Sequence, residues 1–250
     1  MPPRYEVIGI EGIGEVRPGD DIARIVVEAA ARQRTPLASG DVVVLSQKVV
    51  SKSEGRLLRL PDVTPSPMAT TFAAELGRDP RLIEVILRES RRIVRMDRGV
   101  LVTETHHGWV CANAGVDQSN VDADVVALLP VDPDGSARAF RDAVRAQTRA
   151  EVHVIIADTF GRPWREGLVN IAIGVAGFAP LRSYLGERDP AGRPLQATIL
   201  AIADELAAAA EPVMGKLDRI PAALVRGLAL AASEDGSKAL LRDPARDIFR

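Results

Sequence analysis

Two short apolar runs constrain the fold of this chain more than any other feature. Residues 41–45 (DVVVL) are mostly β-branched and do not alternate with polar residues, and residues 152–156 form a second apolar run. Runs of this kind are typical of buried strands, and a run without alternation indicates a strand that is covered on both faces. We therefore predict an α/β (α+β) fold with mixed sheets and covering helices, arranged in one or two lobes.

The remaining elements follow from periodicity, capping residues and turn signals. We predict strands at residues 5–10, 93–94, 100–103 and 222–226, and helices at residues 20–34, 69–77, 80–90, 133–148 and 198–210. Residues 212–216 (PVMGK) are expected to break the last helix, and the polar residues 233–250 are expected to form a peripheral tail. Residues 169–177 are small and apolar, which suits tight packing, with a subunit interface as one option. We find no internal repeat and predict a single domain over residues 1–250, with a core at about 5–230.

Charge and cysteine content exclude several classes of partner. The formal net charge of −2 gives no reason to expect nucleic acid or an anionic membrane as a partner. The single cysteine, Cys111, excludes an internal disulfide and a thiolate zinc cluster, and its apolar neighbours favour a buried, inert thiol. The adjacent His106 and His107 cannot share a helical face, so we interpret them as a hairpin tip. No apolar stretch approaches the ~20 residues of a membrane helix, and the N-terminus lacks a signal-peptide pattern, so the cytoplasm is the expected location.

Acidic side chains follow two of the predicted extended runs. Asp158 and Thr159 follow the run at 152–156, and Asp117 follows the run at 109–115. A carboxylate and a hydroxyl at the end of a buried strand can hold a hard cation. On these residues alone, the simpler interpretation is that the aspartates cap turns.

Basic and glycine-bearing segments could receive an anionic ligand. Residues 46–56 (SQKVVSKSEGR) follow the first buried strand, and we predict a loop whose hydroxyls, amide and two lysines cradle a polyphosphate. Arg162 and Arg165 could receive an anionic substrate. The turn at 11–15 could bring backbone amides close to a nucleotide, although its glycines lack the dinucleotide spacing. A solvated lysine loop, solvated arginines and an ordinary tight turn stay open as alternatives, because no Walker motif occurs in the chain.

In combination these residues predict nucleotide-dependent, metal-assisted phosphoryl chemistry. Two carboxylates and a hydroxyl can hold Mg²⁺ or Mn²⁺ and leave positions open for phosphate oxygens and water. This interpretation requires Asp117 and Asp158 to meet in the fold. A metal-dependent phosphohydrolase or nucleotidyl enzyme would use the same two aspartates, and a non-catalytic GTP-binding module would bind nucleotide without turnover.

Four motifs, in this order along the chain, resemble the coenzyme F420-0:L-glutamate ligase (gamma-glutamyl ligase) family. They are SQKVVSKSEGR, AGVDQSNV, LLPVDPDGSA and ADTFGRPWREG, and the similarity runs from about Gly9 to Gly227. The resemblance implies a GTP-dependent ligase that adds L-glutamate to the lactyl-phosphate end of a deazaflavin coenzyme, F420-0, and then adds further γ-linked glutamates. It also implies Mg²⁺ or Mn²⁺ at two sites, stimulation by K⁺, and an intertwined homodimer with a family-specific α/β fold.

The resemblance also implies roles for individual residues. Asp117 and Asp158 would bind one metal, Thr159 would help to bind a second, and Lys52 would act with the two aspartates in catalysis. The residues expected to contact the nucleotide are Ile13, Gly14, Glu15, Val16, Gln47, Lys48, Lys52 and Asn120.

The chain departs from the family pattern at one position and in its length. Archaeal members place a glutamine where this chain has Lys216, and a protonated lysine cannot ligate a metal, so the second metal's ligands stay open. The resemblance is to the stand-alone form, which lacks the C-terminal nitroreductase-like domain of some actinobacterial members.

Overall fold

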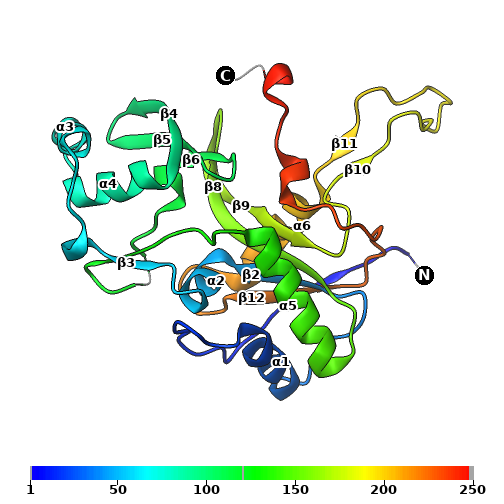
Figure 1. Ribbon diagram of the computed structural model, residues 1–250. Helices are drawn as coiled ribbons and strands as arrows, with labels where there is room; N and C mark the ends of the chain where they lie inside the picture. Colours follow the sequence, from blue (N-terminus) through cyan, green and yellow to red (C-terminus); the bar gives the residue numbers. More distant parts are fainter. Residues whose placement is uncertain (1, 120, 248–250) are drawn as a thin grey trace.

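A five-stranded mixed sheet lies at the centre of the protein (Figure 1). The computed structural model describes residues 2–119 and 121–247. The strand order is β1 (Glu6–Gly9), β12 (Ala222–Arg226), β2 (Val42–Ser46), β8 (His153–Arg162) and β9 (Arg165–Ala176). The β2–β8 pair is parallel and the other three pairs are antiparallel. The predicted α/β class with a mixed sheet is confirmed.

Helices cover both faces of this sheet, as the apolar run at 41–45 predicts. Val43 and Leu45 pack in one hydrophobic cluster with α1 (Ile22–Arg32) and α5 (Pro133–Thr148). Val42 and Val44 point the other way, into a cluster with α6 (Ile202–Met214). All four side chains are fully buried. No helix in the described part of the chain is long and apolar enough to cross a membrane.

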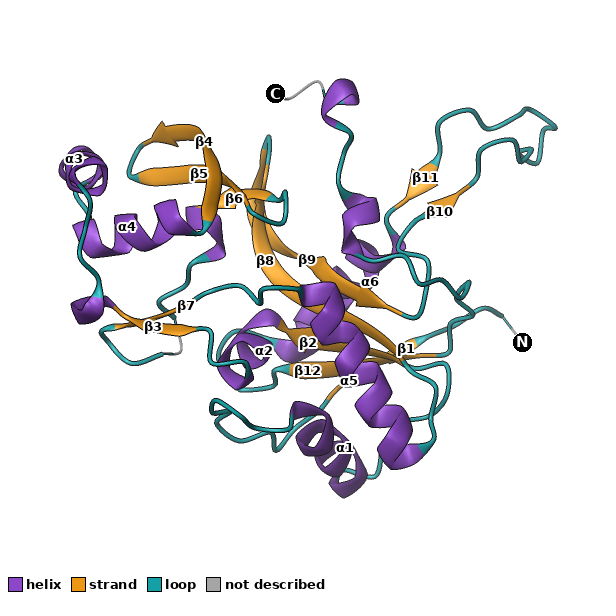
Figure 2. Cartoon of the chain, in the orientation of Figure 1, coloured by secondary structure: helices purple, strands orange, loops and turns teal. Residues whose placement is uncertain are grey.

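The segment between β2 and β8 contains a second, smaller group of elements (Figure 2). It comprises β3 (Leu57–Arg59), η1 (Leu60–Asp62), α3 (Pro67–Leu76), α4 (Pro80–Arg88), β4 (Ser90–Asp97), β5 (Val100–Thr105), β6 (Val110–Ala112), η2 (Asn113–Gly115) and β7 (Val125–Ala127). These elements share a hydrophobic cluster of their own that includes Leu82, Ile83 and Leu101. His106 and His107 lie in the turn between β5 and β6, as expected.

The segment predicted as a polyphosphate loop is a helix instead. α2 (Gln47–Ser53) begins directly after β2. Val50 is buried, and the Gln47 side chain donates a hydrogen bond from Nε2 to Ser51 Oγ one turn later (2.7 Å). The loop prediction was wrong because the many polar residues of this segment suggested a loop. Polar residues four positions apart, such as Gln47 and Ser51, in fact lie on the same face of a helix and contact each other.

The last predicted helix is displaced at both ends. Ile199 and Leu200 form β11 (Ile199–Leu200), which pairs with β10 (Arg182–Ser183) at the base of an arm that projects from the body (Figure 1). α6 begins at Ile202 and continues through Pro212 to Met214. The helix therefore ends within residues 212–216, as expected: Pro212 lies in its last turn, and Gly215 at φ +59° follows as the C-cap.

The residues expected to form a peripheral tail are partly buried. Ser237, at the start of η3 (Ser237–Leu240), is 1% exposed and donates its backbone N–H to Asp134 Oδ1 (2.8 Å). The same carboxylate oxygen accepts the N–H of Val175 on β9 (2.8 Å). The tail is therefore attached to the central sheet, and η4 (Pro244–Arg246) follows it.

The small residues at 169–177 pack within the chain. A Cβ atom at Gly174 would lie 2.5 Å from the carbonyl oxygen of Pro133, at the start of α5. Glycine at this position allows β9 and α5 to approach each other. This intramolecular contact explains the glycine at position 174, and a subunit interface at residues 169–177 stays a prediction.

Candidate active site

A cleft of about 720 Å³ brings together segments that lie far apart in the sequence. Its walls come from the loop before α1, from α2, from residues 117, 119, 121 and 122, from β8 and β9, and from the end of α6 with the residues that follow it. The expected site residues on this wall are Ile13, Gly14, Glu15, Val16, Gln47, Lys48, Lys52, Asp117, Asp158 and Thr159. Asn120 lies outside the described residues.

The parallel pairing of β2 with β8 places two of these groups at one edge of the sheet. Ser46 lies opposite Ala157, so the first turn of α2, with Lys48, is next to Asp158. β8 was expected to end at Asp158, and this was wrong: the strand continues to Arg162. A register shift between Ile156 and Ala157 locally disturbs the pairing with β9 just before Asp158.

Asp117 also differs from its expected place at a strand end. β6 ends at Ala112, and Asp117 follows η2 as an isolated bridge to Ala127, with reciprocal backbone hydrogen bonds of 3.0 and 2.8 Å. Lys48 Nζ lies 2.7 Å from Asp117 Oδ2 and donates to Ser119 Oγ (2.6 Å). Burial opposes the ionisation of Asp117, but hydrogen bonds from Lys48 and Ser119 outweigh it and lower its pKa.

Asp158 has the opposite electrostatic environment. Burial raises its pKa to about 6, and the negative charge of Asp117 adds to this effect. The hydrogen bond that the Thr159 N–H donates to Asp158 Oδ1 (2.9 Å) and the charges of Lys48 and Lys216 offset it in part. Because the two carboxylates face the same cleft and repel each other, a cation bound between them would stabilise the ionised form of both.

This donor set fits a hard divalent cation. The carboxylates of Asp117 and Asp158 and the hydroxyl of Thr159 are oxygen ligands of the kind that Mg²⁺ and Mn²⁺ prefer. No group of three His, Cys, Asp or Glu side chains suited to a metal ion occurs within residues 2–119 and 121–247. A metal bound here would therefore need ligand oxygens in addition to the two carboxylates.

Comparison with known proteins identifies the family of this chain. The model of the F420-0:gamma-glutamyl ligase family matches residues 11–227. The chain belongs to this family. It is 47% identical to a protein of Methanothermobacter thermautotrophicus named Coenzyme F420:L-glutamate ligase, over 98% of both chains. Proteins of the same name from Methanopyrus kandleri and Methanocaldococcus jannaschii are 48% and 40% identical over 99% of this chain and 97% of each relative.

In this gamma-glutamyl ligase, Lys216 lies at the hydroxyl that the resemblance assigns to a second metal. Lys216 Nζ donates to Thr159 Oγ1 (2.6 Å) and lies 4.0 Å from Glu211 Oε1. Thr159 in turn donates to Asn170 Oδ1 (2.8 Å), and Asn170 Nδ2 donates to Glu211 Oε2 (2.7 Å). The ammonium group is thus part of a continuous polar chain along the cleft wall.

Sequence reasoning missed Asn170 and Glu211. The sequence offered one signal for Asn170, which is a polar residue near the start of the apolar segment at 169–177. The structure pairs it with Thr159 across β8 and β9. Glu211 had none, since its position depends on where α6 ends against the sheet. The residues after α6 that line the cleft were also missed: Gly215, Arg219, Ile220 and Pro221.

A salt bridge holds the loop before α1 against α2. The ammonium group of Lys52 pairs with the carboxylate of Glu15, and the Lys52 side chain is only 10% exposed. The N–H of Gly19 donates to the carbonyl oxygen of Ser53 (2.8 Å), which fixes the other end of the loop. The segment that the family resemblance assigns to the nucleotide therefore forms one wall of the cleft.

Three other residues that the sequence singled out do not line the cleft. Arg162 and Arg165 pair at the end of the β8–β9 hairpin, where Arg162 Nη2 donates to the carbonyl oxygen of Glu166 (2.6 Å). They are not among the described residues that line the cleft, and their role toward an anionic substrate stays a prediction. Cys111 is buried, and burial, with a smaller effect from Asp158, raises its pKa to about 12. The expectation of a buried thiol is confirmed, and its lack of reactivity stays a prediction.

Proposed function

We propose that this protein joins L-glutamate to F420-0 with GTP as cosubstrate and releases GDP and phosphate. The observation that carries the proposal is the convergence of Lys48, Lys52, Asp117 and Asp158 on one cleft. It is supported by the near full-length similarity to proteins named Coenzyme F420:L-glutamate ligase.

The reaction proceeds in two steps. A terminal carboxylate oxygen of the acceptor attacks the γ-phosphorus of GTP, the bond from that phosphorus to the leaving oxygen of GDP breaks, and an acyl phosphate forms. The amine nitrogen of glutamate then attacks the acyl carbon, phosphate leaves, the amine gives up a proton, and an amide remains. Repetition of both steps on the new γ-carboxylate adds further γ-linked glutamates.

The residues of the cleft would bind and orient the reactants. Lys48 and Lys52 would neutralise phosphate oxygens, and their spacing on one helical face lets both approach the same triphosphate. Asp117 and Asp158 would hold one Mg²⁺ or Mn²⁺, which when bound supplies charge stabilisation at the phosphates, and Thr159 belongs to the second cation position. The other nucleotide contacts would come from residues 13–16, Gln47 and Asn120.

Lys216 alters the expected metal content. Its ammonium group, 2.6 Å from Thr159 Oγ1, supplies a positive charge where a second divalent cation would otherwise bind. We therefore assign one divalent cation to the cleft and regard Lys216 as a built-in replacement for the second. Stimulation by K⁺ is retained as part of the proposal.

The β10–β11 arm is the element best suited to an intertwined homodimer. It pairs with no other strand in the described part of the chain, and Leu185 and Ile199 on it are 51% and 47% exposed. The proposal also places the enzyme in the cytoplasm, without nucleic acid or membrane partners.

The proposal is tested by incubating the purified protein with GTP, L-glutamate, MnCl₂ and F420-0 and following the glutamylated product by mass spectrometry. Asp158→Asn should reduce product formation roughly 100-fold or more, because it removes a carboxylate that would hold the divalent cation at the phosphates. Asp142→Asn, at an exposed aspartate on α5, is the matched control and should react as the wild type does. Near-normal ligation by D158N would exclude the metal assignment, and GDP release without glutamate and F420-0 would favour a phosphohydrolase.

A further inference from the structure

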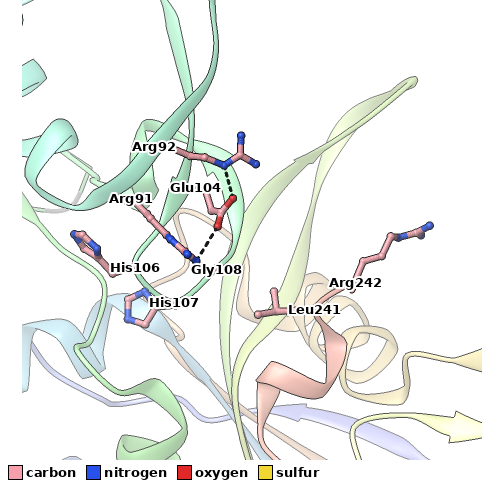
Figure 3. Close-up of a pocket in the computed structure, with 8 residues that line it drawn as sticks. All are labelled: Arg91, Arg92, Glu104, His106, His107, Gly108, Leu241 and Arg242. Atoms are coloured by element: carbon pink, nitrogen blue, oxygen red, sulfur yellow. Dashed lines mark hydrogen bonds and ion pairs between the residues drawn. The ribbon is translucent and has the colours of Figure 1, made fainter. Parts of the chain in front are cut away.

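A second cavity, of about 390 Å³, lies outside the nucleotide cleft. The β4–β5 hairpin, the turn between β5 and β6, and the segment after η3 form its wall (Figure 3). The charged side chains on this wall are Arg91, Arg92, Arg242 and Glu104. Three of these four side chains are cationic.

The carboxylate of Glu104 is shared by two of the arginines. Arg92 Nε donates to Glu104 Oε2 (2.8 Å), and Arg91 Nη1 lies 3.5 Å from Glu104 Oε1. Figure 3 shows both guanidinium groups reaching this one side chain. Glu104 is 4% exposed, whereas the side chains of Arg91 and Arg92 are 71% and 45% exposed. Because one carboxylate cannot neutralise two guanidinium groups, a net positive charge remains on the accessible side.

The cavity is close to the nucleotide cleft, and residues 128–131 separate the two. Gln47, on the cleft wall, donates from Nε2 to the carbonyl oxygen of Leu128 (3.2 Å). His107, on the cavity wall, contacts the carbonyl oxygen of Pro130 through Nε2 (2.9 Å). His107 Nε2 also lies 3.1 Å from the carbonyl oxygen of Val131. Gln47 on the cleft wall and His107 on the cavity wall therefore contact the same four-residue segment.

The two walls differ in charge. The cleft carries five acidic and four basic side chains: Glu15, Asp117, Asp122, Asp158 and Glu211 against Lys48, Lys52, Lys216 and Arg219. Its formal charge is −1, and a bound triphosphate would add negative charge that one divalent cation offsets only in part. A second polyanionic ligand would therefore be repelled from the cleft unless its other charges were bound elsewhere.

We infer that the second cavity is an anion-binding subsite for the acceptor. It receives the phosphodiester or glutamyl carboxylates of the acceptor while the reacting carboxylate lies in the cleft. Guanidinium groups suit this role because they bind phosphate and carboxylate oxygens in a bidentate manner. Arg91 is the main contact, since it is the more exposed of the pair and the less tightly bound to Glu104. The inference rests on the proposed function.

The test compares Arg91→Glu with Arg95→Glu. Arg95 lies on the same strand, is 72% exposed and pairs with Asp97, away from the cavity wall. R91E leaves the Arg92–Glu104 hydrogen bond in place, so it should fold normally, as urea unfolding would verify. Titration with F420-0, followed by deazaflavin fluorescence, should give a Kd about fivefold or more higher for R91E and unchanged for R95E. The KM for F420-0 should rise by the same factor, with the KM values for GTP and L-glutamate unchanged.

Three results would overturn the inference: wild-type affinity in R91E, an equal loss in R95E, or no binding of F420-0 by the wild type. A rise confined to the KM for L-glutamate would assign the cavity to the amino acid and also overturn it. A wild type that binds no F420-0 would overturn the proposed function as well. The proposed function alone fails if the wild type binds F420-0 and R91E binds it more weakly, but no glutamylated product forms in the presence of GTP and L-glutamate.

Discussion

At the scale of single residues, two lysine ammonium groups contact oxygen atoms that, according to the family resemblance, are ligands of metal ions. Lys48 contacts Asp117 and Lys216 contacts Thr159. The surroundings differ, because the side chain of Lys48 is 16% exposed and that of Lys216 is 62% exposed. A lysine can occupy a cation position without the ligand geometry that a metal demands.

The first prediction concerns Lys216→Gln. The wild type should bind one Mn²⁺ per chain in the presence of GDP, and K216Q should bind two, because an amide oxygen can ligate a metal and the competing charge is gone. Electron paramagnetic resonance titration of free Mn²⁺ measures the stoichiometry. Lys238→Gln, in η3, is the control and should bind as the wild type does. Two Mn²⁺ ions on the wild type would contradict the assignment of Lys216.

At the scale of elements, single carboxylates join neighbouring parts of the chain. Glu84 on α4 accepts the N–H of Ser66, the N-cap of α3 (2.9 Å), and also pairs with Arg88 (2.8 Å). The hydrogen bonds from Ser66, followed by Arg88, lower the pKa of Glu84 from 4.5 to about 2. The ionised carboxylate therefore stabilises the contact between α3 and α4.

Glu84→Gln should reduce the free energy of unfolding by about 1 kcal/mol at pH 7. Because the pKa of Glu84 is lower in the folded state, its contribution is complete above pH 4.5 and is lost as the pH falls toward 2. The difference between wild type and E84Q should therefore shrink in acid. Urea unfolding between pH 7 and pH 3 tests this, with Glu75→Gln at an exposed position on α3 as control. If the difference in unfolding free energy between wild type and E84Q stayed constant over this pH range, the ionised Glu84 carboxylate would not be the stabilising group.

Asp134→Ala should detach the C-terminal segment. The buried Asp134 carboxylate accepts the N–H groups of Val175 and Ser237, so its loss should cost about 2–3 kcal/mol of unfolding free energy. Amide hydrogen exchange at Ser237 should accelerate more than exchange in α1. Asp142→Ala, on the same helix but 68% exposed, should leave both measurements unchanged. Unaltered exchange at Ser237 in D134A would show that other contacts hold the segment.

Local patterns predict some elements well and others poorly. The run at 41–45 was predictable because its side chains alternate between two apolar clusters, which requires apolar residues at every position. α2 was missed because a short, polar helix that is held by its neighbours has no strong periodicity of its own. The meeting of Asp117 and Asp158 depends on the parallel register of β2 with β8 and on the bridge from Asp117 to Ala127. No local sequence pattern near Asp117 or Asp158 predicts either of these two pairings.

At the scale of the whole molecule, the β10–β11 arm projects from the body, and its strands pair with no other strand among the described residues. Replacing residues 183–199 by a short glycine–serine linker should convert a dimer to a folded monomer, because the arm's strands pair only with each other among the described strands. Sedimentation velocity measures the change. Leu185→Ser on the arm should weaken association, whereas Met68→Ser, at an exposed site on α3, should not. A monomeric wild type would refute the role of the arm.

The position of β12 between β1 and β2 affects how the protein folds during its synthesis. β1 and β2 each pair with β12 and share no hydrogen bonds with each other, so β1 can join the sheet only after residues 222–226 have been synthesised. Until then, the strand edges that β12 covers are unpaired. Folding of the sheet is therefore expected to be slow, because most of its pairings join distant parts of the chain.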